Sequence, residues 1–502
     1  MLDFTAAEKE AFFFETSVKE AVNGNHGLDM QFVGIKFLEI LVSEFSPSTS
    51  TAMGLPREFH EQCRISLEQE YMKAFYCWVQ NAAFVVSNRI IGAESEIPEV
   101  KVCSAALCLM LQILNWDFRG KNENSKRGIN VFFDATKQEN DYLRRSECIL
   151  VLPGPAWRDV LISSGHVGWL LNFYSAVRQK FSCEGYWPDC PLAVYARKLL
   201  VQFCSLTGAI FPSGLDDGHM QRQHLLQLLA GIVQWMEPPE AVVEAIKSGK
   251  SESELLDGCR TLVSLATVTN PFVFDELLKN LRPYGTLTLL SALMCEASKD
   301  LMENRTEEET WSWVSRDILL DTWTALLVQL DGSGHNNSLP PEGISAAANV
   351  FGLIVDSELK AASASVFTHE DEYDVLQASV SRLSSYALIA RAAIGHAICH
   401  LTERFSERVM RLSQLLDRSL GERLPHTDVL QIGQTLGRGI SDPTETLEEL
   451  YSLLLITGHV LADEGQGETP LVPKEIESHY TDIVEVDKHP VIILSGFNHT
   501  VC

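Results

Sequence analysis

The sequence is poor in positive charge and in cysteine, and it has no long apolar run. Lysine and arginine together number 40 against 67 aspartates and glutamates, which gives a formal charge of −27. Nucleic acids and anionic membranes both require clustered cations, so this balance argues against either as a partner and favours basic proteins. The 12 cysteines are scattered, without a CxxC pair, and do not suggest a disulfide framework. No apolar stretch reaches the ~18 residues of a membrane span, so membrane insertion is not expected.

Proline is absent from long segments, and these segments carry a helical period. In residues 224–236, apolar side chains fall at 225, 228/229, 232 and 235/236, which places them along one face of a helix. Similar stripes recur in 28–45, 59–91, 100–118, 157–181, 192–209, 285–302, 310–330, 343–361, 375–401, 403–420 and 444–462. Asn270-Pro271 and Asp442-Pro443 are typical of helix starts. Two short apolar runs, Cys148–Leu152 and Val491–Leu494, could be strands or segments that dock on helices.

The helices arrive in pairs with short polar breaks, which predicts an all-α fold of the α-α superhelix type. Helix pairs every ~40–47 residues are typical of HEAT and armadillo solenoids. We therefore expect one HEAT-like solenoid over residues 1–490 and an irregular tail over 491–502. Polar inter-helix loops are expected near 119–147, 331–342, 362–374 and 462–475. The alternative is a multi-helix globular domain.

Motifs for catalysis and for nucleotide or metal binding occur only in incomplete form. Gly249-Lys250-Ser251 resembles the end of a phosphate-binding loop, but Glu244 stands where the loop needs glycine. His60-Glu61 begins like a zinc-protease helix, but Arg64 replaces the second ligand. Asp331–His335 resembles the start of a calcium loop without its central glycine. We expect no catalytic residues, cofactor or metal, and only a site assembled from distant residues would make the chain an enzyme.

One histidine pair and several tryptophans lie on apolar helices. His396 and His400 are four residues apart beside Cys399, a spacing that suits either a zinc site with further ligands or two structural histidines. Five tryptophans lie on helix stripes and are expected to pack between helices: Trp116, Trp157, Trp169, Trp235 and Trp323.

Two acidic clusters are candidates for a partner-binding surface. The first is Glu307, Glu308 and Glu309, and the second is Glu370, Asp371 and Glu372. Carboxylates are also common in the first turn of a helix, where they oppose the helix dipole. A surface for a basic partner is the functional interpretation.

An ordered set of segments resembles a known family. It comprises Leu111–Phe118, Pro153–Arg158, Gly168–Leu170, Gln202–Pro212 and the helix Leu225–Met236. In this order they resemble the exportin-4 family of nuclear transport receptors, in its plant-like form, within the importin-β (karyopherin) superfamily. The resemblance is strongest over about 30–290 and continues more weakly to about 490.

The resemblance implies a HEAT superhelix that binds the GTPase Ran in its GTP form together with protein cargo. Cargo linked to the family includes translation initiation factor 5A and Smad-type factors, and nuclear pore proteins are further partners. The implied location is the nucleus and the cytoplasm. A HEAT scaffold that assembles proteins without Ran is the alternative.

The sequence departs from the family in length. Family members are considerably longer, and we expect the repeats that chiefly hold Ran to precede Met1. Lys488–Leu494 reads like the start of a further helix that stops at Ser495. We therefore expect an internal part of a receptor, and no residue of the family's Ran or cargo sites is transferred.

Overall fold

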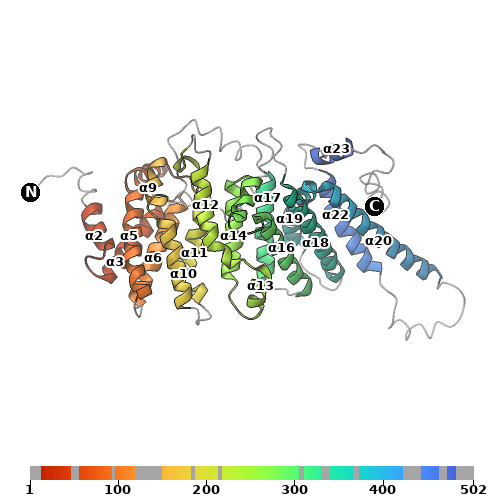
Figure 1. The fold of residues 1–502 in the computed structure, drawn as a ribbon, viewed down its shortest axis with the longest axis horizontal. Helices are drawn as coiled ribbons and strands as arrows, with labels where there is room; N and C mark the ends of the chain where they lie inside the picture. Colours follow the sequence, from red (N-terminus) through yellow and green to blue (C-terminus); the bar gives the residue numbers. More distant parts are fainter. Residues whose placement is uncertain are drawn as a thin grey trace, which may run out of the picture. The chain divides into compact units, whose positions relative to one another are not determined.

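The computed structural model describes residues 13–46, 56–92, 97–116, 118, 150–181, 187–212, 218–304, 310–328, 339–365, 372–421, 443–462 and 472–481. Within these ranges, the side chains of 57, 97, 364–365, 372–381, 416–421 and 480–481 are not described. The fold class is all-α, as predicted, and helices within each part stack side by side as in a helical solenoid (Figure 1). The described chain contains one isolated parallel bridge, between Val151 and Leu206. The run around Val151 therefore contributes a single bridge residue to the structure.

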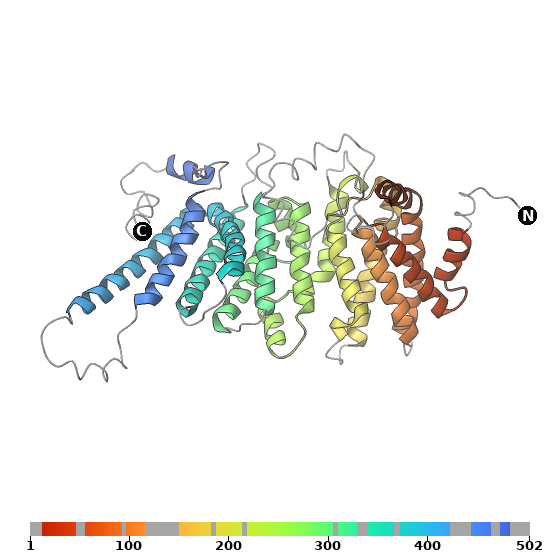
Figure 2. The same ribbon diagram turned by 180° about the vertical axis from the view of Figure 1, so that it is seen from behind.

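The chain divides into two compact units, which are described separately. Unit 1 comprises residues 1–269 and 276–283, and unit 2 comprises 270–275 and 284–502. Views from opposite sides show neighbouring helices of each unit running side by side (Figures 1 and 2). The boundary between the units runs through α15 (Pro271–Lys279).

Unit 1 is built from two rows of helices. One row runs α3, α6, α11 and α14, with each helix packed on the next, and the other runs α5, α10 and α12. The long helices are α3 (Leu28–Glu44), α5 (Met72–Gly92), α6 (Ile97–Leu114), α10 (His166–Lys180), α11 (Pro191–Cys204), α12 (His219–Ile232) and α14 (Ser253–Val268). Shorter elements are η1 (Phe13–Val18), α2 (Lys19–Val22), α4 (Arg57–Ser66), η2 (Leu67–Tyr71), η4 (Pro155–Trp157), α9 (Arg158–Leu161), η5 (Trp187–Asp189), η6 (Gly208–Ile210), η7 (Val233–Trp235) and α13 (Pro239–Lys247).

Unit 2 repeats this plan with longer helices. Its helices are α16 (Thr286–Glu303), α17 (Trp311–Val328), α18 (Pro341–Ser365), α19 (Glu372–Ala392), α20 (Ile394–Gly421), α22 (Pro443–Leu461) and α23 (Lys474–Thr481). Helix α16 packs on α17 and α18, and α19 packs on α17 and α18. Helix α22 packs against α18, α19 and α20, so three neighbours bury its inner face.

Local sequence explains where these helices begin. Pro191 occupies the first turn of α11, where its missing N–H has no intrahelical role. Asn270 Oδ1 accepts a hydrogen bond from Val273 N–H at 2.9 Å, so the predicted cap of α15 is confirmed. Helix α16 begins after Gly285, which has no side chain to cap it. Asp275 of α15 replaces that cap, since its Oδ1 accepts from Leu287 N–H at 3.0 Å.

The predicted stripes match most of the helices, and two of the differences are informative. The stripe 375–401 is interrupted, because α19 ends at Ala392 and α20 begins at Ile394. Residues 239–279 showed no stripe but contain α13, α14 and α15. Helix α14 buries residues almost all round its circumference, among them Glu254, Asp257 and Thr261, so its buried positions include polar ones that a hydrophobic stripe omits.

The prediction that the five tryptophans pack between helices is confirmed. Trp116, Trp235 and Trp323 are fully buried, Trp157 is buried, and Trp169 is half-buried. Trp116 Nε1 donates to Glu68 at 3.0 Å, and Trp169 Nε1 donates to Ser87 Oγ at 3.2 Å. None of the helices in the described ranges combines the length and the apolar character needed to cross a membrane.

Candidate protein-binding surface

The acidic clusters predicted as a binding surface lie outside the described side chains. Glu307, Glu308 and Glu309 fall in 305–309, and Glu370 and Asp371 fall in 366–371, which the structure does not describe. Glu372 begins α19, but its side chain is not described. The expectation of a basic partner at these residues therefore stays a prediction.

The histidine pair of α20 lies among charged neighbours. His396 and Cys399 are exposed, while His400 Nε2 lies 3.8 Å from Asp356 Oδ1 on α18. Asp356 also pairs with Arg404 Nε at 2.9 Å. Burial opposes ionisation of Asp356, but His400 and Arg404 outweigh it and lower the pKa of the carboxyl. In the part of the chain that the structure describes, no three His, Cys, Asp or Glu side chains gather as a metal site would require.

The residues of the incomplete phosphate-loop and zinc-protease motifs make ordinary structural contacts. Lys250 Nζ lies 3.5 Å from Glu254, and Ser251 Oγ donates to Asp189 at 3.1 Å. His60 Nε2 lies 2.9 Å from the Glu44 carbonyl oxygen. Asp331–His335 lies outside the described residues.

Unit 1 contains a buried ionic network that has no counterpart among the sequence motifs. Arg197 of α11 is 1% exposed, and its Nε donates to Asp257 of α14 at 2.7 Å. The Tyr174 hydroxyl of α10 donates to Glu254 at 2.9 Å and accepts from Arg197 at 3.3 Å. Burial, followed by the charge of Glu254, raises the pKa of Tyr174. The network joins α10, α11 and α14, and its donors and acceptors are directed at one another, as in a structural network.

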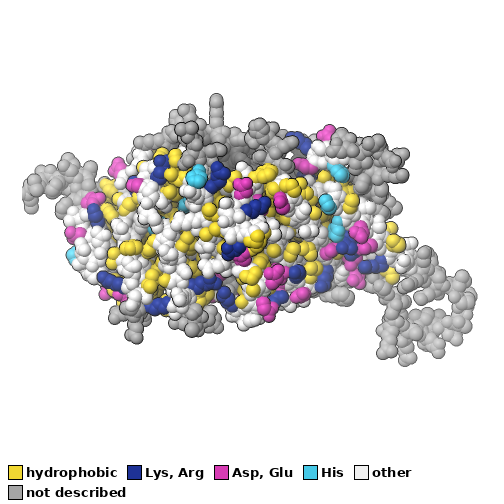
Figure 3. All heavy atoms as spheres, viewed as in Figure 1, with side chains coloured by type: hydrophobic (Ala, Val, Ile, Leu, Met, Phe, Trp, Pro, Cys, Tyr) yellow, Lys and Arg dark blue, Asp and Glu magenta, His cyan; other side chains and the backbone are white. Residues whose placement is uncertain are grey.

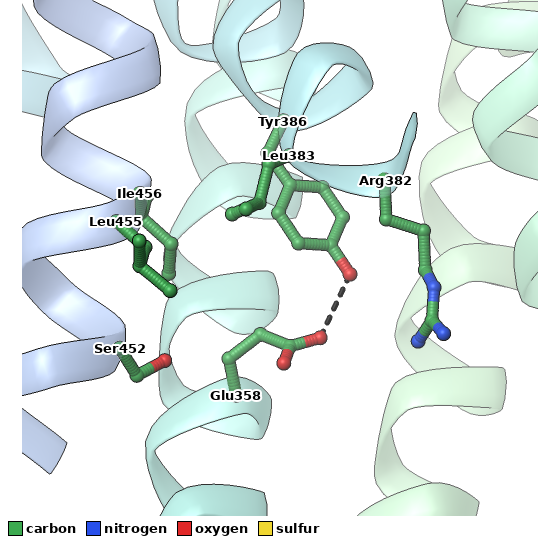
Figure 4. A pocket seen from close by; sticks show the side chains of 7 residues that line it. All are labelled: Glu358, Arg382, Leu383, Tyr386, Ser452, Leu455 and Ile456. Atoms are coloured by element: carbon green, nitrogen blue, oxygen red, sulfur yellow. Dashed lines mark hydrogen bonds between the residues drawn. The ribbon is translucent and has the colours of Figure 1, made fainter. Parts of the chain in front are cut away.

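Unit 2 contains a small pocket between α18, α19 and α22. It has a volume of about 80 Å³ and is lined by Glu358, Arg382, Leu383, Tyr386, Ser452, Leu455 and Ile456. Figure 4 shows the Glu358 carboxylate reaching the Tyr386 hydroxyl, which donates to it at 2.8 Å, with the α22 side chains on one side and Arg382 on the other. Drug-sized ligands occupy pockets of ~300–1,000 Å³. This pocket is smaller than that.

Arg382 lines the pocket and also lies beside an exposed tryptophan. Trp313 of α17 is 39% exposed, and the guanidinium groups of Arg316 and Arg382 lie 4.9 and 5.3 Å from its ring centroid. Cations at these distances are attracted to the face of the ring. Tryptophan, tyrosine and arginine are the residues that most often anchor protein interfaces. We call Trp313, Arg316, Arg382, the pocket residues and Tyr451 the unit 2 surface.

Sequence reasoning did not find this surface, although a signal was present. The buried residues of α17 include Ser312, Ser315 and Leu319, so Trp313 lies off the buried stripe. In α22, Leu447, Tyr451 and Leu455 form a second apolar row besides the buried one. The sequence therefore shows that α22 has two apolar rows, but it does not show which of them is buried.

Charged and hydrophobic side chains are mixed over the face of the molecule in Figure 3, with both signs of charge present. No model of a known protein family matches the chain.

Proposed function

We propose that the chain acts as a nuclear export receptor of the exportin-4 type, which binds Ran-GTP and protein cargo together for transport from nucleus to cytoplasm. The observation that carries the proposal is the unit 2 surface, which presents Trp313, Arg382 and Tyr451 on a stack of helices. The resemblance of Leu111–Phe118, Pro153–Arg158 and the later segments to this family supplies the identity of the partners.

The stacked helices support a passive receptor. In a solenoid each helix pair contacts mainly its neighbours, so the stack can flex and present a long surface. Two ligands that stabilise the same curvature bind with positive coupling, and this requires no chemistry by the receptor. The charge of −27 favours encounter with basic cargo, for which the family suggests translation initiation factor 5A and Smad-type factors.

A binding experiment with Ran in each nucleotide state tests the proposal. Immobilised natural protein containing this chain is exposed to Ran locked with GTP or with GDP, each with and without cargo. We expect cargo and Ran-GTP to be retained together and Ran-GDP to be washed away. A scaffold unrelated to Ran would retain the same amount of cargo with Ran-GTP as with Ran-GDP, and that result would contradict the proposal.

A further inference from the structure

Helix α22 has two apolar faces, and its neighbours cover one of them. Leu450, Leu453, Ile456 and Val460 are buried where α22 packs on α18, α19 and α20. Leu447, Tyr451 and Leu455 are 48%, 56% and 39% exposed. Their spacing of four residues aligns them in one row, about 12 Å long at 1.5 Å per residue. We call this row the α22 strip.

The charged side chains that α22 itself contributes have one sign, and Arg408 and Arg411 of α20 reach Glu449 beside them. Helix α22 contains Glu445, Glu448 and Glu449 and no lysine or arginine. Glu449 is buried and paired with Arg408 at 3.0 Å, whereas Glu445 is exposed and Glu448 is half-buried. At 100° per residue, Glu448 and Glu445 lie on the same edge of the strip.

The pocket opens on this same edge. Ser452 and Leu455 of α22 line it, so an apolar side chain lying along the strip can enter it. Glu358 adds a further carboxylate there, and Arg382 is the cation among the lining residues. The guanidinium of Arg382 lies over Trp313, at the far side of the pocket from α22. The strip is therefore apolar, and its edge carries Glu445, Glu448 and Glu358 together with Arg382.

A second apolar row serves as a comparison. On α3 of unit 1, Met30, Val33, Phe37 and Ile40 are also exposed. Beside them, Lys36 and Glu39 form an ion pair of 2.6 Å, and the same helix also carries Asp29 and Glu44. The α3 row therefore differs from the α22 strip in having a cation on its own helix.

We infer that the α22 strip docks a basic amphipathic helix of a partner protein, with an apolar anchor in the pocket and lysine or arginine facing Glu445 and Glu448. Helix-in-groove binding uses anchors spaced three and four residues apart, as the strip presents them. The opposite charge on the partner speeds encounter and fixes its register. The inference names a partner chemistry for the proposed receptor, and the surface itself does not require Ran.

A pair of synthetic peptides tests the inference. Both are amphipathic helices of about five turns with leucines at i, i+4 and i+7, and one carries lysines where the other carries glutamates. Binding to the full chain is measured by fluorescence anisotropy at several salt concentrations. We expect the lysine peptide to bind, with affinity that falls as salt rises, and the glutamate peptide not to bind.

Variants locate the binding site. Tyr451→Ser and Leu447→Ser are each expected to weaken binding of the lysine peptide about tenfold or more, as the loss of an interface anchor does. Glu445→Gln with Glu448→Gln should weaken binding and flatten its salt dependence. Met410→Ser on α20 and Ile40→Ser on α3 remove side chains that are 60% and 67% exposed, and these controls should leave binding unchanged. Thermal unfolding verifies that each variant is folded.

Three outcomes would overturn the inference. The first is equal binding of the two peptides, and the second is binding that the α22 substitutions leave unchanged. The third is a chain that self-associates until Tyr451→Ser makes it monomeric in sedimentation, because a second copy would then cover the strip. None of these outcomes depends on Ran. The docking inference can therefore be correct if the export proposal is wrong, and the export proposal can be correct if the docking inference is wrong.

Discussion

At the residue scale, the most consequential side chains are charged groups buried between helices. Arg197 donates to Asp257 at 2.7 Å, to the Pro188 carbonyl oxygen at 2.6 Å and to Tyr174 at 3.3 Å. Asp257 also pairs with Arg260 at 3.0 Å. A buried ion that loses its partner keeps its desolvation penalty without compensation. Stability in unit 1 therefore depends on the network being complete.

We predict that Arg197→Met lowers the free energy of unfolding by about 3–5 kcal/mol, because it leaves Asp257 buried with one cation fewer. Urea unfolding followed by tryptophan fluorescence measures this change, since Trp187 and Trp235 both contact Tyr174. Arg178→Gln is the matched control, as Arg178 pairs with Glu254 but is 26% exposed, and its loss should be smaller. Equal losses for the two variants would show that burial of Arg197 is not the cause.

Two buried histidines predict a pH dependence of stability. Burial lowers the pKa of His166 to about 3 and that of His224 to about 4, from an ordinary value of 6.5. Between these values and pH 6.5 the unfolded chain binds more protons than the folded chain, so stability falls as pH falls. Each histidine contributes a slope of up to ~1.4 kcal/mol per pH unit in its window.

The prediction is tested by removing the titrating group. Between about pH 4 and 6, His166→Gln should reduce the slope of the unfolding free energy against pH. The reduction should be roughly the contribution of one histidine to that slope. Tyr76→Phe removes the hydroxyl that lies 3.0 Å from His166 Nε2 but keeps the imidazole. This control should lower stability evenly across the range. A slope that survives His166→Gln unchanged would exclude His166 as its origin.

At the element scale, salt bridges hold the long helix α20 against its neighbours. Glu449 of α22 is 5% exposed and accepts from Arg408 at 3.0 Å, from Arg411 at 3.3 Å and from Ser363 of α18 at 2.8 Å. One carboxylate thus ties three helices of unit 2 together. Its removal leaves Arg408 with Glu407 as its remaining carboxylate partner, at 2.8 Å.

We predict that Glu449→Gln speeds amide hydrogen exchange in α20 around residues 404–411 by about 10- to 100-fold, as expected for the loss of a buried charged hydrogen bond. Exchange in unit 1 should not change. Glu407→Gln is the control, because its carboxylate is 46% exposed and its loss should have a smaller effect. If amide exchange is identical in Glu449→Gln and in the natural chain, Glu449 does not hold α20 against its neighbours.

Most helices were predictable, because a stripe such as that of α12 reflects burial on one side only. Helix α14 was not, since it is buried almost all round and its inward positions include Asp257. The unit 2 surface was missed because hydrophobicity alone does not separate Trp313, which is exposed, from Trp323, which is buried. The partners of Arg197 lie up to 60 residues away in sequence, so its network follows from tertiary packing.

At the scale of the whole molecule, the molecule combines a strong net negative charge with local anchors for proteins. The charge of −27 acts over about a Debye length and favours encounter with basic partners. Exposed aromatic side chains such as Trp313 and Tyr451 are of the kind that often anchors protein interfaces. Under the export proposal, the chain works through coupled binding equilibria.

The most direct test is the affinity of cargo measured with and without Ran-GTP in the natural protein that contains this chain. Isothermal titration of translation initiation factor 5A, repeated in saturating Ran-GTP, gives the coupling. We predict that Ran-GTP tightens cargo binding by about 5- to 150-fold, and that cargo tightens Ran-GTP binding by the same factor. Cargo affinity that is the same with Ran-GTP, with Ran-GDP and without Ran would contradict the export function.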